Sequence, residues 1–162
     1  MIAVTGANGF VGQAITSRLT SDGRLVRPLV RADVASKMPS AVAVGGMGPE
    51  TDWASKLVGV SCVIHCAARV HVMKDRETDP LAAYRAINVE GTRRLAMESS
   101  KAGVRRLIFI SSIKVNGEQT LSGQAFSEAD KPAPNDPYGV SKWEAEQALH
   151  AVATETGLEV VV

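Results

Sequence analysis

The chain has 162 residues, of which 45% are hydrophobic and only 4% aromatic, which suits one α/β domain packed from Ala, Val, Ile and Leu. Its 18 basic and 17 acidic residues give a net charge of +1 without a basic cluster, which argues against nucleic acid or a membrane surface as a partner. The apolar opening before the first Thr-Gly turn is too short for a signal peptide or a membrane span, so we expect a cytoplasmic protein.

Apolar runs alternate with helical patterns along the chain, which is typical of a parallel sheet with crossover helices. The predicted strands cover residues 1–5, 25–30, 41–44, 60–66, 105–111 and 158–162. The predicted helices cover residues 10–21, 51–57, 80–102 and 137–156, and residues 117–135 form a long polar loop. We therefore predict a doubly wound parallel sheet. In such a sheet, ligands bind in a crevice beyond the C-terminal ends of the strands, and here the sequence stops inside the last predicted strand, which leaves that crevice half-built. We therefore expect residues 1–162 to be a domain cut short at the sixth strand, lacking a C-terminal substrate-binding part.

A glycine-rich turn joins the first predicted strand to the first predicted helix, through Gly6, Gly9 and Gly12. Glycine lets the backbone turn tightly, approach a pyrophosphate closely and pack the helix against the strand. The N–H groups and the positive dipole at the start of that helix then face the anion. Glycines are also common in turns without a ligand, but this position after an apolar run predicts dinucleotide binding.

The two cysteines, Cys62 and Cys66, lie four residues apart in a predicted buried strand with His65 between them. At roughly 3.3 Å per residue their Cα atoms would lie about 13 Å apart, beyond the limit of about 7 Å for a disulfide. The same distance prevents them from sharing a metal ion with His65. We predict reduced core cysteines and no metal site.

A second group of polar residues combines Ser112, Tyr138 and Lys142. Tyr138 and Lys142 are four residues apart in a predicted helix and share a face, while Ser112 follows a predicted strand whose C-terminal end borders the ligand crevice. For the phenol to act as a base near neutrality, its pKa must fall by about three units, roughly 4 kcal/mol. The Lys142 charge favours the phenolate, and Ser112 would hold the substrate oxygen.

Five motifs in a fixed order resemble those of the extended short-chain dehydrogenases/reductases, in the NAD-dependent epimerase/dehydratase family. They are Thr5-Gly-Ala-Asn-Gly-Phe-Val-Gly12, Ile64-His-Cys-Ala-Ala68, Asn88-Val-Glu-Gly-Thr92, Phe109-Ile-Ser-Ser-Ile-Lys-Val-Asn-Gly117 and Tyr138-Gly-Val-Ser-Lys142. The resemblance spans the whole chain and implies the N-terminal Rossmann portion of an enzyme that acts on nucleotide-diphosphate sugars.

The resemblance also implies the roles of individual residues. It implies a catalytic triad of Ser112, Tyr138 and Lys142, with Lys142 also on the nicotinamide ribose. It implies that the cofactor is lined by Gly6, Gly9, Phe10, Val11, Gly12, Arg31, Met47, Cys66, Ala67, Ala68, Asn88, Tyr138 and Lys142. Helices 80–102 and 137–156 resemble the pair that forms a homodimer interface in this family.

Two positions depart from the family pattern. The acidic residue that ends the second strand in NAD-preferring members is Val30 here, followed by Arg31, whose charge suits a 2′-phosphate. The cofactor is therefore NADP or NAD, with NADP favoured, although the nearby Asp33 could fill the NAD role. The acidic residue usual near the adenine is Gly46, with Met47 next.

For the family role we expect a nucleotide-sugar epimerase similar to UDP-hexose 4-epimerases, with an NADPH-dependent UDP-4-keto-sugar reductase as the alternative. The 162-residue chain itself could instead be a cofactor-binding fragment without activity. His71 and Lys74 fall where the family places residues of the substrate loop. Glu144, Glu146 and His150 are interpreted as an exposed helix face.

Overall fold

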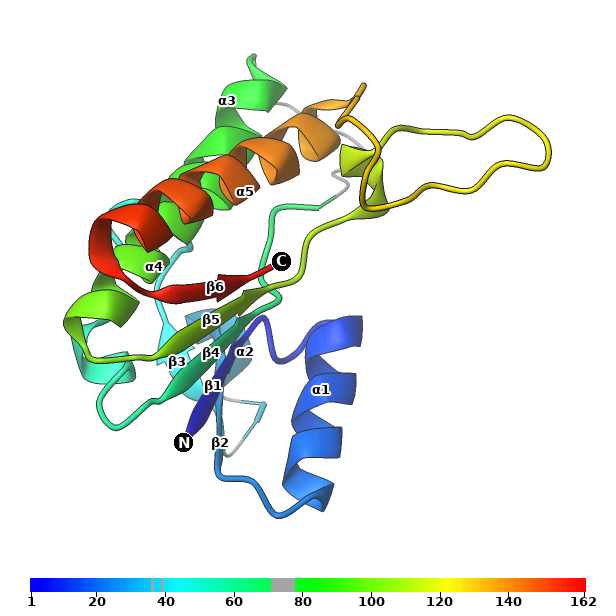
Figure 1. The fold of residues 1–162 in the computed structure, drawn as a ribbon. Helices are drawn as coiled ribbons and strands as arrows, with labels where there is room; N and C mark the ends of the chain where they lie inside the picture. Colours follow the sequence, from blue (N-terminus) through cyan, green and yellow to red (C-terminus); the bar gives the residue numbers. More distant parts are fainter. Residues whose placement is uncertain (36, 39, 71–77) are drawn as a thin grey trace.

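The computed structural model describes residues 1–35, 37–38, 40–70 and 78–162. Six strands form one sheet in the order β3-β2-β1-β4-β5-β6, and every neighbouring pair is parallel (Figure 1). The strands are β1 (Ile2–Thr5), β2 (Val26–Arg31), β3 (Val42–Val44), β4 (Cys62–His65), β5 (Arg106–Phe109) and β6 (Glu159–Val161). This order reverses direction between β1 and β4, and it confirms the predicted doubly wound Rossmann fold.

The helices agree with the sequence prediction in part. They are α1 (Phe10–Ser21), α2 (Ala32–Ala35), α3 (Pro80–Arg85), α4 (Thr92–Lys101) and α5 (Pro137–Thr156). The predicted helix 80–102 is interrupted by a π-helical segment, η2 (Ala86–Gly91), between α3 and α4. The short helix α2 and the 3₁₀ turn η3 (Ile113–Val115) were not predicted.

The predicted helix 51–57 is wrong, because only one 3₁₀ turn, η1 (Ala54–Lys56), forms there. Trp53 and Leu57 are buried four residues apart, a spacing that also fits a helix. The Thr51 hydroxyl, however, donates to the Gly46 carbonyl and accepts from the Gly48 N–H, so the chain before Trp53 is held in a turn. Gly59, at φ 71°, turns the chain again shortly after Leu57.

Alternate residues of the strands build a core on each face of the sheet. Ala3, Leu29 and Val63 belong to the cluster packed under α4 and α5, whereas their neighbours Val4 and Val30 belong to the cluster under α1 and α2. Figure 1 shows α1 on one side of the sheet and α3, α4 and α5 on the other. Full burial of a Val or Leu side chain contributes roughly 1.5–3 kcal/mol, so both layers are held firmly against the sheet.

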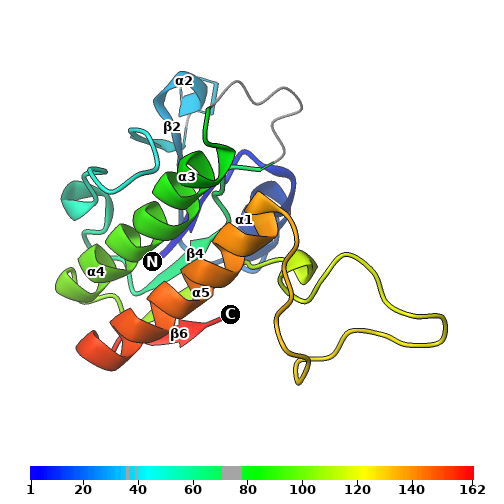
Figure 2. The ribbon, with the colours of Figure 1, turned by 90° about the horizontal axis from the view of Figure 1, so that it is seen from above.

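Residues 117–135 run as a loop without helix or strand, as predicted, and extend away from the body of the molecule (Figures 1 and 2). The loop is tied at its base, where the Ala133 N–H donates to the Val115 carbonyl over 3.0 Å. Among the residues that the structure describes, no helix is both long and apolar enough to cross a membrane.

Candidate cofactor and catalytic site

The glycine turn after β1 has the close packing that a pyrophosphate cradle needs. Gly6 has a φ of +62°, and a Cβ there would lie 2.8 Å from the Ala67 N atom. A Cβ on Gly12 would lie 2.2 Å from the Gly6 carbonyl oxygen, so only glycine fits. In the described part of the chain, no side chain caps α1 at Gly9 and no acidic residue occupies its first turn. The positive end of α1 is therefore available to an anion.

The residues predicted to line the pyrophosphate and the nicotinamide surround this turn. Phe10 is 94% exposed at the start of α1, and Val11 beside it is also exposed. Cys66 and Ala68 are half-buried in the segment that follows β4. Both cysteines are free, and burial raises the pKa of the Cys66 thiol to about 11, so this thiol is protonated at neutral pH and is a poor nucleophile.

A buried chain of hydrogen bonds fixes the segment after β4 to β1 and α4. The Ala67 N–H donates to Thr5 Oγ1 over 3.2 Å, Thr5 Oγ1 lies 2.6 Å from His65 Nδ1, and His65 Nε2 lies 2.9 Å from Thr92 Oγ1. Burial lowers the pKa of His65 from 6.5 to about 3, with a smaller contribution from the Lys142 charge. His65 is therefore a neutral bridge that holds one wall of the site.

Asn88 lies in the π-helical segment η2 and is 2% exposed. Its Oδ1 accepts from the Arg69 N–H over 2.7 Å, and its Nδ2 donates to the Arg69 carbonyl over 3.0 Å and to Ser141 Oγ over 2.9 Å. Ser141 in turn donates to the Tyr138 carbonyl over 2.8 Å. Asn88 thus supports the segment after β4 and links it to the first turn of α5, in keeping with the predicted supporting role.

The start of α5 places Tyr138 beside Ser112. Asp136 caps the helix by accepting from the Gly139 N–H over 2.7 Å, and it forms an ion pair with Lys114 from η3. The Tyr138 side chain is half-buried and forms a hydrogen bond with the Ser112 side chain. Burial raises the pKa of the phenol above 10.0, and the hydrogen bond with Ser112 opposes that rise. The structure therefore brings the predicted phenol and hydroxyl together.

Lys142 lies one helical turn after Tyr138 and is only 2% exposed. Its Nζ donates to the Ile110 carbonyl over 2.7 Å and lies 3.6 Å from the centre of the Phe109 ring. Burial lowers the pKa of Lys142 from 10.5 to about 7, although the charge of Glu146 opposes this. The ammonium is thus held against the end of β5.

Arg31, at the end of β2, carries the predicted cofactor preference. Its Nε and Nη2 donate to the two carboxylate oxygens of Asp33 over 3.1 and 3.0 Å. Both side chains are about two-thirds exposed, at 67% and 65%. The guanidinium that suits a 2′-phosphate and the carboxylate that suits a 2′-hydroxyl therefore lie together at the same strand end.

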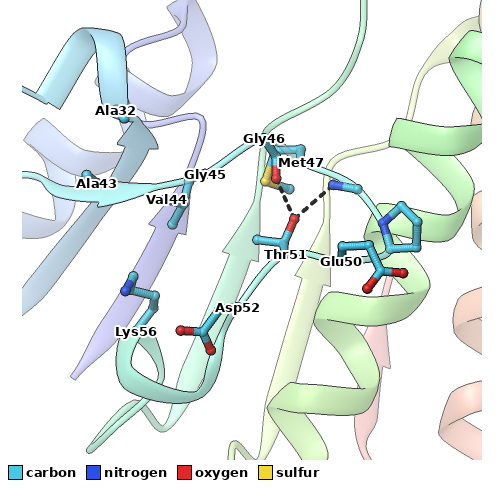
Figure 3. A pocket seen from close by; sticks show the side chains of 12 residues that line it. Ala32, Ala43, Val44, Gly45, Gly46, Met47, Glu50, Thr51, Asp52 and Lys56 are labelled. Atoms are coloured by element: carbon cyan, nitrogen blue, oxygen red, sulfur yellow. Dashed lines mark hydrogen bonds between the residues drawn. The ribbon is translucent and has the colours of Figure 1, made fainter.

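A cavity of about 510 Å³ opens beside β3 and is bordered by residues that follow β2 and β3 (Figure 3). Its lining includes Ala32, Gly46 and Met47 on one side, and Asp52 and Lys56 on the other. Met47 is half-buried and also packs against the core under α4 and α5. The position assigned to the adenosine end of a dinucleotide thus borders open space.

The contacts of two acidic residues were missed by the sequence analysis. Glu144 and Glu146, interpreted as parts of an exposed helix face, are both half-buried. Glu144 pairs with Arg85 and Glu146 accepts a hydrogen bond from the Ser111 hydroxyl, whereas His150 is exposed as expected. The signal available in the sequence was the spacing of Glu146, four residues after Lys142 on the same helix. His71 and Lys74 lie outside the described residues.

Comparison with known proteins agrees with this arrangement. The model of the NAD dependent epimerase/dehydratase family matches residues 2–162. A UDP-glucose 4-epimerase from Vibrio cholerae is 45% identical over 99% of this chain and 49% of its own length. The chain therefore spans about half the length of this curated relative.

Solved structures of similar fold also match the chain almost from end to end. The chain superposes with a TM-score of 0.82 on a short-chain dehydrogenase/reductase superfamily protein from Agrobacterium tumefaciens with bound NAD, at 33% identity over 99% of this chain and 47% of the other. It superposes with a TM-score of 0.79 on MoeE5 in complex with UDP-glucose and NAD, at 31% identity over 98% of this chain and 51% of the other. With its family model matched almost from end to end, the chain belongs to the NAD dependent epimerase/dehydratase family.

Proposed function

We propose that the protein of which this chain forms at least a part is an NAD(P)-dependent nucleotide-sugar 4-epimerase of the UDP-hexose type. The chain contributes the cofactor-binding domain and the catalytic residues Ser112, Tyr138 and Lys142. The observation that carries the proposal is the hydrogen bond between Ser112 and Tyr138 at the strand ends, in a chain 45% identical to a UDP-glucose 4-epimerase. Two structural neighbours with bound NAD support the cofactor class.

The chain's own residues supply binding, orientation and proton transfer. When bound, the cofactor provides a nicotinamide ring that can take a hydride from the sugar carbon and later return it. Ser112 hydrogen-bonds the sugar oxygen and holds it next to Tyr138. The Tyr138 phenolate accepts the hydroxyl proton as the hydride leaves, and the phenol returns that proton when the hydride comes back. A bound cofactor that returned the hydride to the opposite face of the sugar would invert the carbon.

Burial of the phenol by itself works against this proton transfer. Burial raises the pKa of Tyr138, whereas a base near neutrality needs a lowered pKa. The positive charge of Lys142 is the group in this chain that can favour the phenolate, but its Nζ is engaged by the Ile110 carbonyl. We therefore expect cofactor binding to draw the ammonium toward the ribose and the phenol.

A homodimer through the outer faces of α3, α4 and α5 is part of the same proposal. These helices cover one face of the sheet together, and Arg85 of α3 forms an ion pair with Glu144 of α5 over 2.5 Å. The shared layer gives a continuous helical surface. Light scattering of the purified protein at several concentrations would test this, and a mass equal to one chain at all of them would contradict it.

The activity is tested with the complete gene product, incubated with UDP-glucose or UDP-N-acetylglucosamine and a trace of NAD. We expect the 4-epimer to accumulate without net consumption of the cofactor. Stoichiometric loss of NADPH on a UDP-4-keto sugar would show a reductase instead, and no reaction with any nucleotide sugar would overturn both functions. The 162-residue chain alone should bind cofactor but turn over poorly, since substrate positioning contributes roughly 7–11 kcal/mol.

A further inference from the structure

Three consecutive residues at the end of β5 each contact a different turn of α5. The Ile110 carbonyl accepts from Lys142 Nζ over 2.7 Å. The next residue, Ser111, donates its hydroxyl hydrogen to the Glu146 carboxylate, and Ser112 forms the hydrogen bond with Tyr138. Two of the three residues on α5 belong to the proposed catalytic set. The third, Glu146, has no role in the chemistry described above.

Glu146 lies one helical turn beyond Lys142, and residues four apart share a helix face with Cβ atoms about 5–6 Å apart. Among the residues that the structure describes, the other titratable groups that interact with Lys142 are His65 and Cys66, from β4 and the segment after it. His65 is neutral, since its pKa is about 3, and the pKa of Cys66 is about 11. Within the described part of the chain, the carboxylate of Glu146 is thus the negative charge that acts on this ammonium at neutral pH.

We propose that Glu146 is a positioning residue of the site, whose carboxylate is held in place by the Ser111 hydroxyl and favours the ammonium form of the buried Lys142. The inference rests on the proposed function, because the positive charge of Lys142 matters to catalysis only where Tyr138 must become a phenolate. Without this carboxylate, burial would lower the pKa of Lys142 further, and a smaller share of Lys142 would be protonated at neutral pH. A neutral amine would not favour the phenolate.

The experiment measures the pKa of Lys142 in the protein by NMR, using lysine labelled with ¹³C at Cε and assigned with a Lys142→Arg variant. In Glu146→Gln, which keeps the size and an acceptor oxygen, we expect the pKa of Lys142 to fall by about one unit. Glu146→Asp, which keeps the charge, should restore most of the value. Glu144→Gln removes a charge from the same helix, but from a residue paired with Arg85, and should leave Lys142 unchanged.

An unchanged pKa of Lys142 in a folded Glu146→Gln protein would overturn the proposal, as would an equal fall in Glu144→Gln. Far-UV circular dichroism establishes that each variant is folded. In the complete enzyme, Glu146→Gln should move the alkaline loss of kcat to a pH about one unit lower, which a purely structural role would not do. Failure of the epimerase function would remove this kinetic effect but not the shift seen by NMR, so the two failures can be distinguished.

Discussion

The phenol of Tyr138 is the group on which the proposed chemistry depends, and it can be removed with little change in packing. In Tyr138→Phe we expect kcat of the complete enzyme to fall by about 10²–10⁴, because no other group takes the proton. Cofactor affinity, measured by fluorescence titration, should stay within about twofold, because the lost hydroxyl acts in the transition state and not in binding of the cofactor.

Tyr84 provides a matched control. Its ring packs edge-on to Tyr138 at 6.2 Å between ring centres and is more deeply buried, at 7% exposed, but its hydroxyl donates to the Val70 carbonyl over 3.4 Å. Tyr84→Phe should leave kcat within a few-fold. A joint loss of affinity and turnover in Tyr138→Phe would assign that side chain a structural role instead.

Cofactor choice depends on the pair formed by Arg31 and Asp33. Asp33 occupies the guanidinium that a 2′-phosphate would need, and an exposed ion pair of this kind contributes about 0.2–1 kcal/mol. Asp33→Asn should therefore improve the affinity for NADP relative to NAD by about two- to fivefold. Arg31→Gln should change the ratio in the opposite direction. Isothermal titration calorimetry with NADP and with NAD measures the ratio of the two affinities. The same ratio in both variants and in the unaltered protein would show that the pair does not select the cofactor.

At the scale of elements, the contact between β1 and α1 leaves no room for a side chain at Gly12. Because a Cβ there would lie 2.2 Å from the Gly6 carbonyl oxygen, Gly12→Ala must displace the helix or the turn. We expect a loss of stability of about 1–3 kcal/mol in urea unfolding, together with loss of cofactor binding. Gly45→Ala, where a Cβ meets nothing within 4 Å, should change stability by less than about 0.5 kcal/mol. Equal effects in the two variants would contradict this account.

The strands were predictable because a parallel sheet covered on both faces needs near-continuous apolar runs. Residues 105–111 show this, since Leu107 and Phe109 face one core and Ile108 faces the other. The π-helical turn at residues 86–91 was not predicted, and it interrupts a segment read as one continuous helix. Residues 51–57 were wrongly predicted as a helix. The buried residues Trp53 and Leu57 have helical spacing, but a single 3₁₀ turn is enough to bury both.

The candidate site was predictable to the extent that it follows from position in the chain. Ser112 after a strand and Tyr138 at a helix start were expected to converge, and they do, because parallel strands end on one edge of the sheet. Side-chain partners were not predictable. The contacts of Lys142 with the Ile110 carbonyl and of Glu146 with Ser111 depend on how closely α5 packs against the end of β5.

At the scale of the whole molecule, two buried groups make stability depend on pH. His65 has a folded pKa of about 3 against 6.5 when exposed, so the unfolded chain binds more protons between these values. Stability should therefore fall by a few kcal/mol as the pH falls from 6.5 toward 3. Lys142 has a folded pKa of about 7 against 10.5, so stability should rise as the pH rises from 7 toward 10.5.

Urea midpoints at pH 4, 7 and 9 test both halves of this prediction. The acid loss should be smaller in His65→Gln, and the alkaline gain should be absent from Lys142→Met, although both variants start from lower stability at pH 7. The same midpoint at all three values of pH in the unaltered protein would contradict the burial of these two groups in solution.

The loop of residues 117–135 offers a place to attach a reporter. Leu121 in this loop is 72% exposed, and the loop extends away from the body of the molecule (Figure 2). A maleimide dye on Leu121→Cys would react faster than the two native cysteines, because burial raises the pKa of both thiols. Energy transfer from the nicotinamide of a bound reduced coenzyme to that dye would then follow ligand docking in real time.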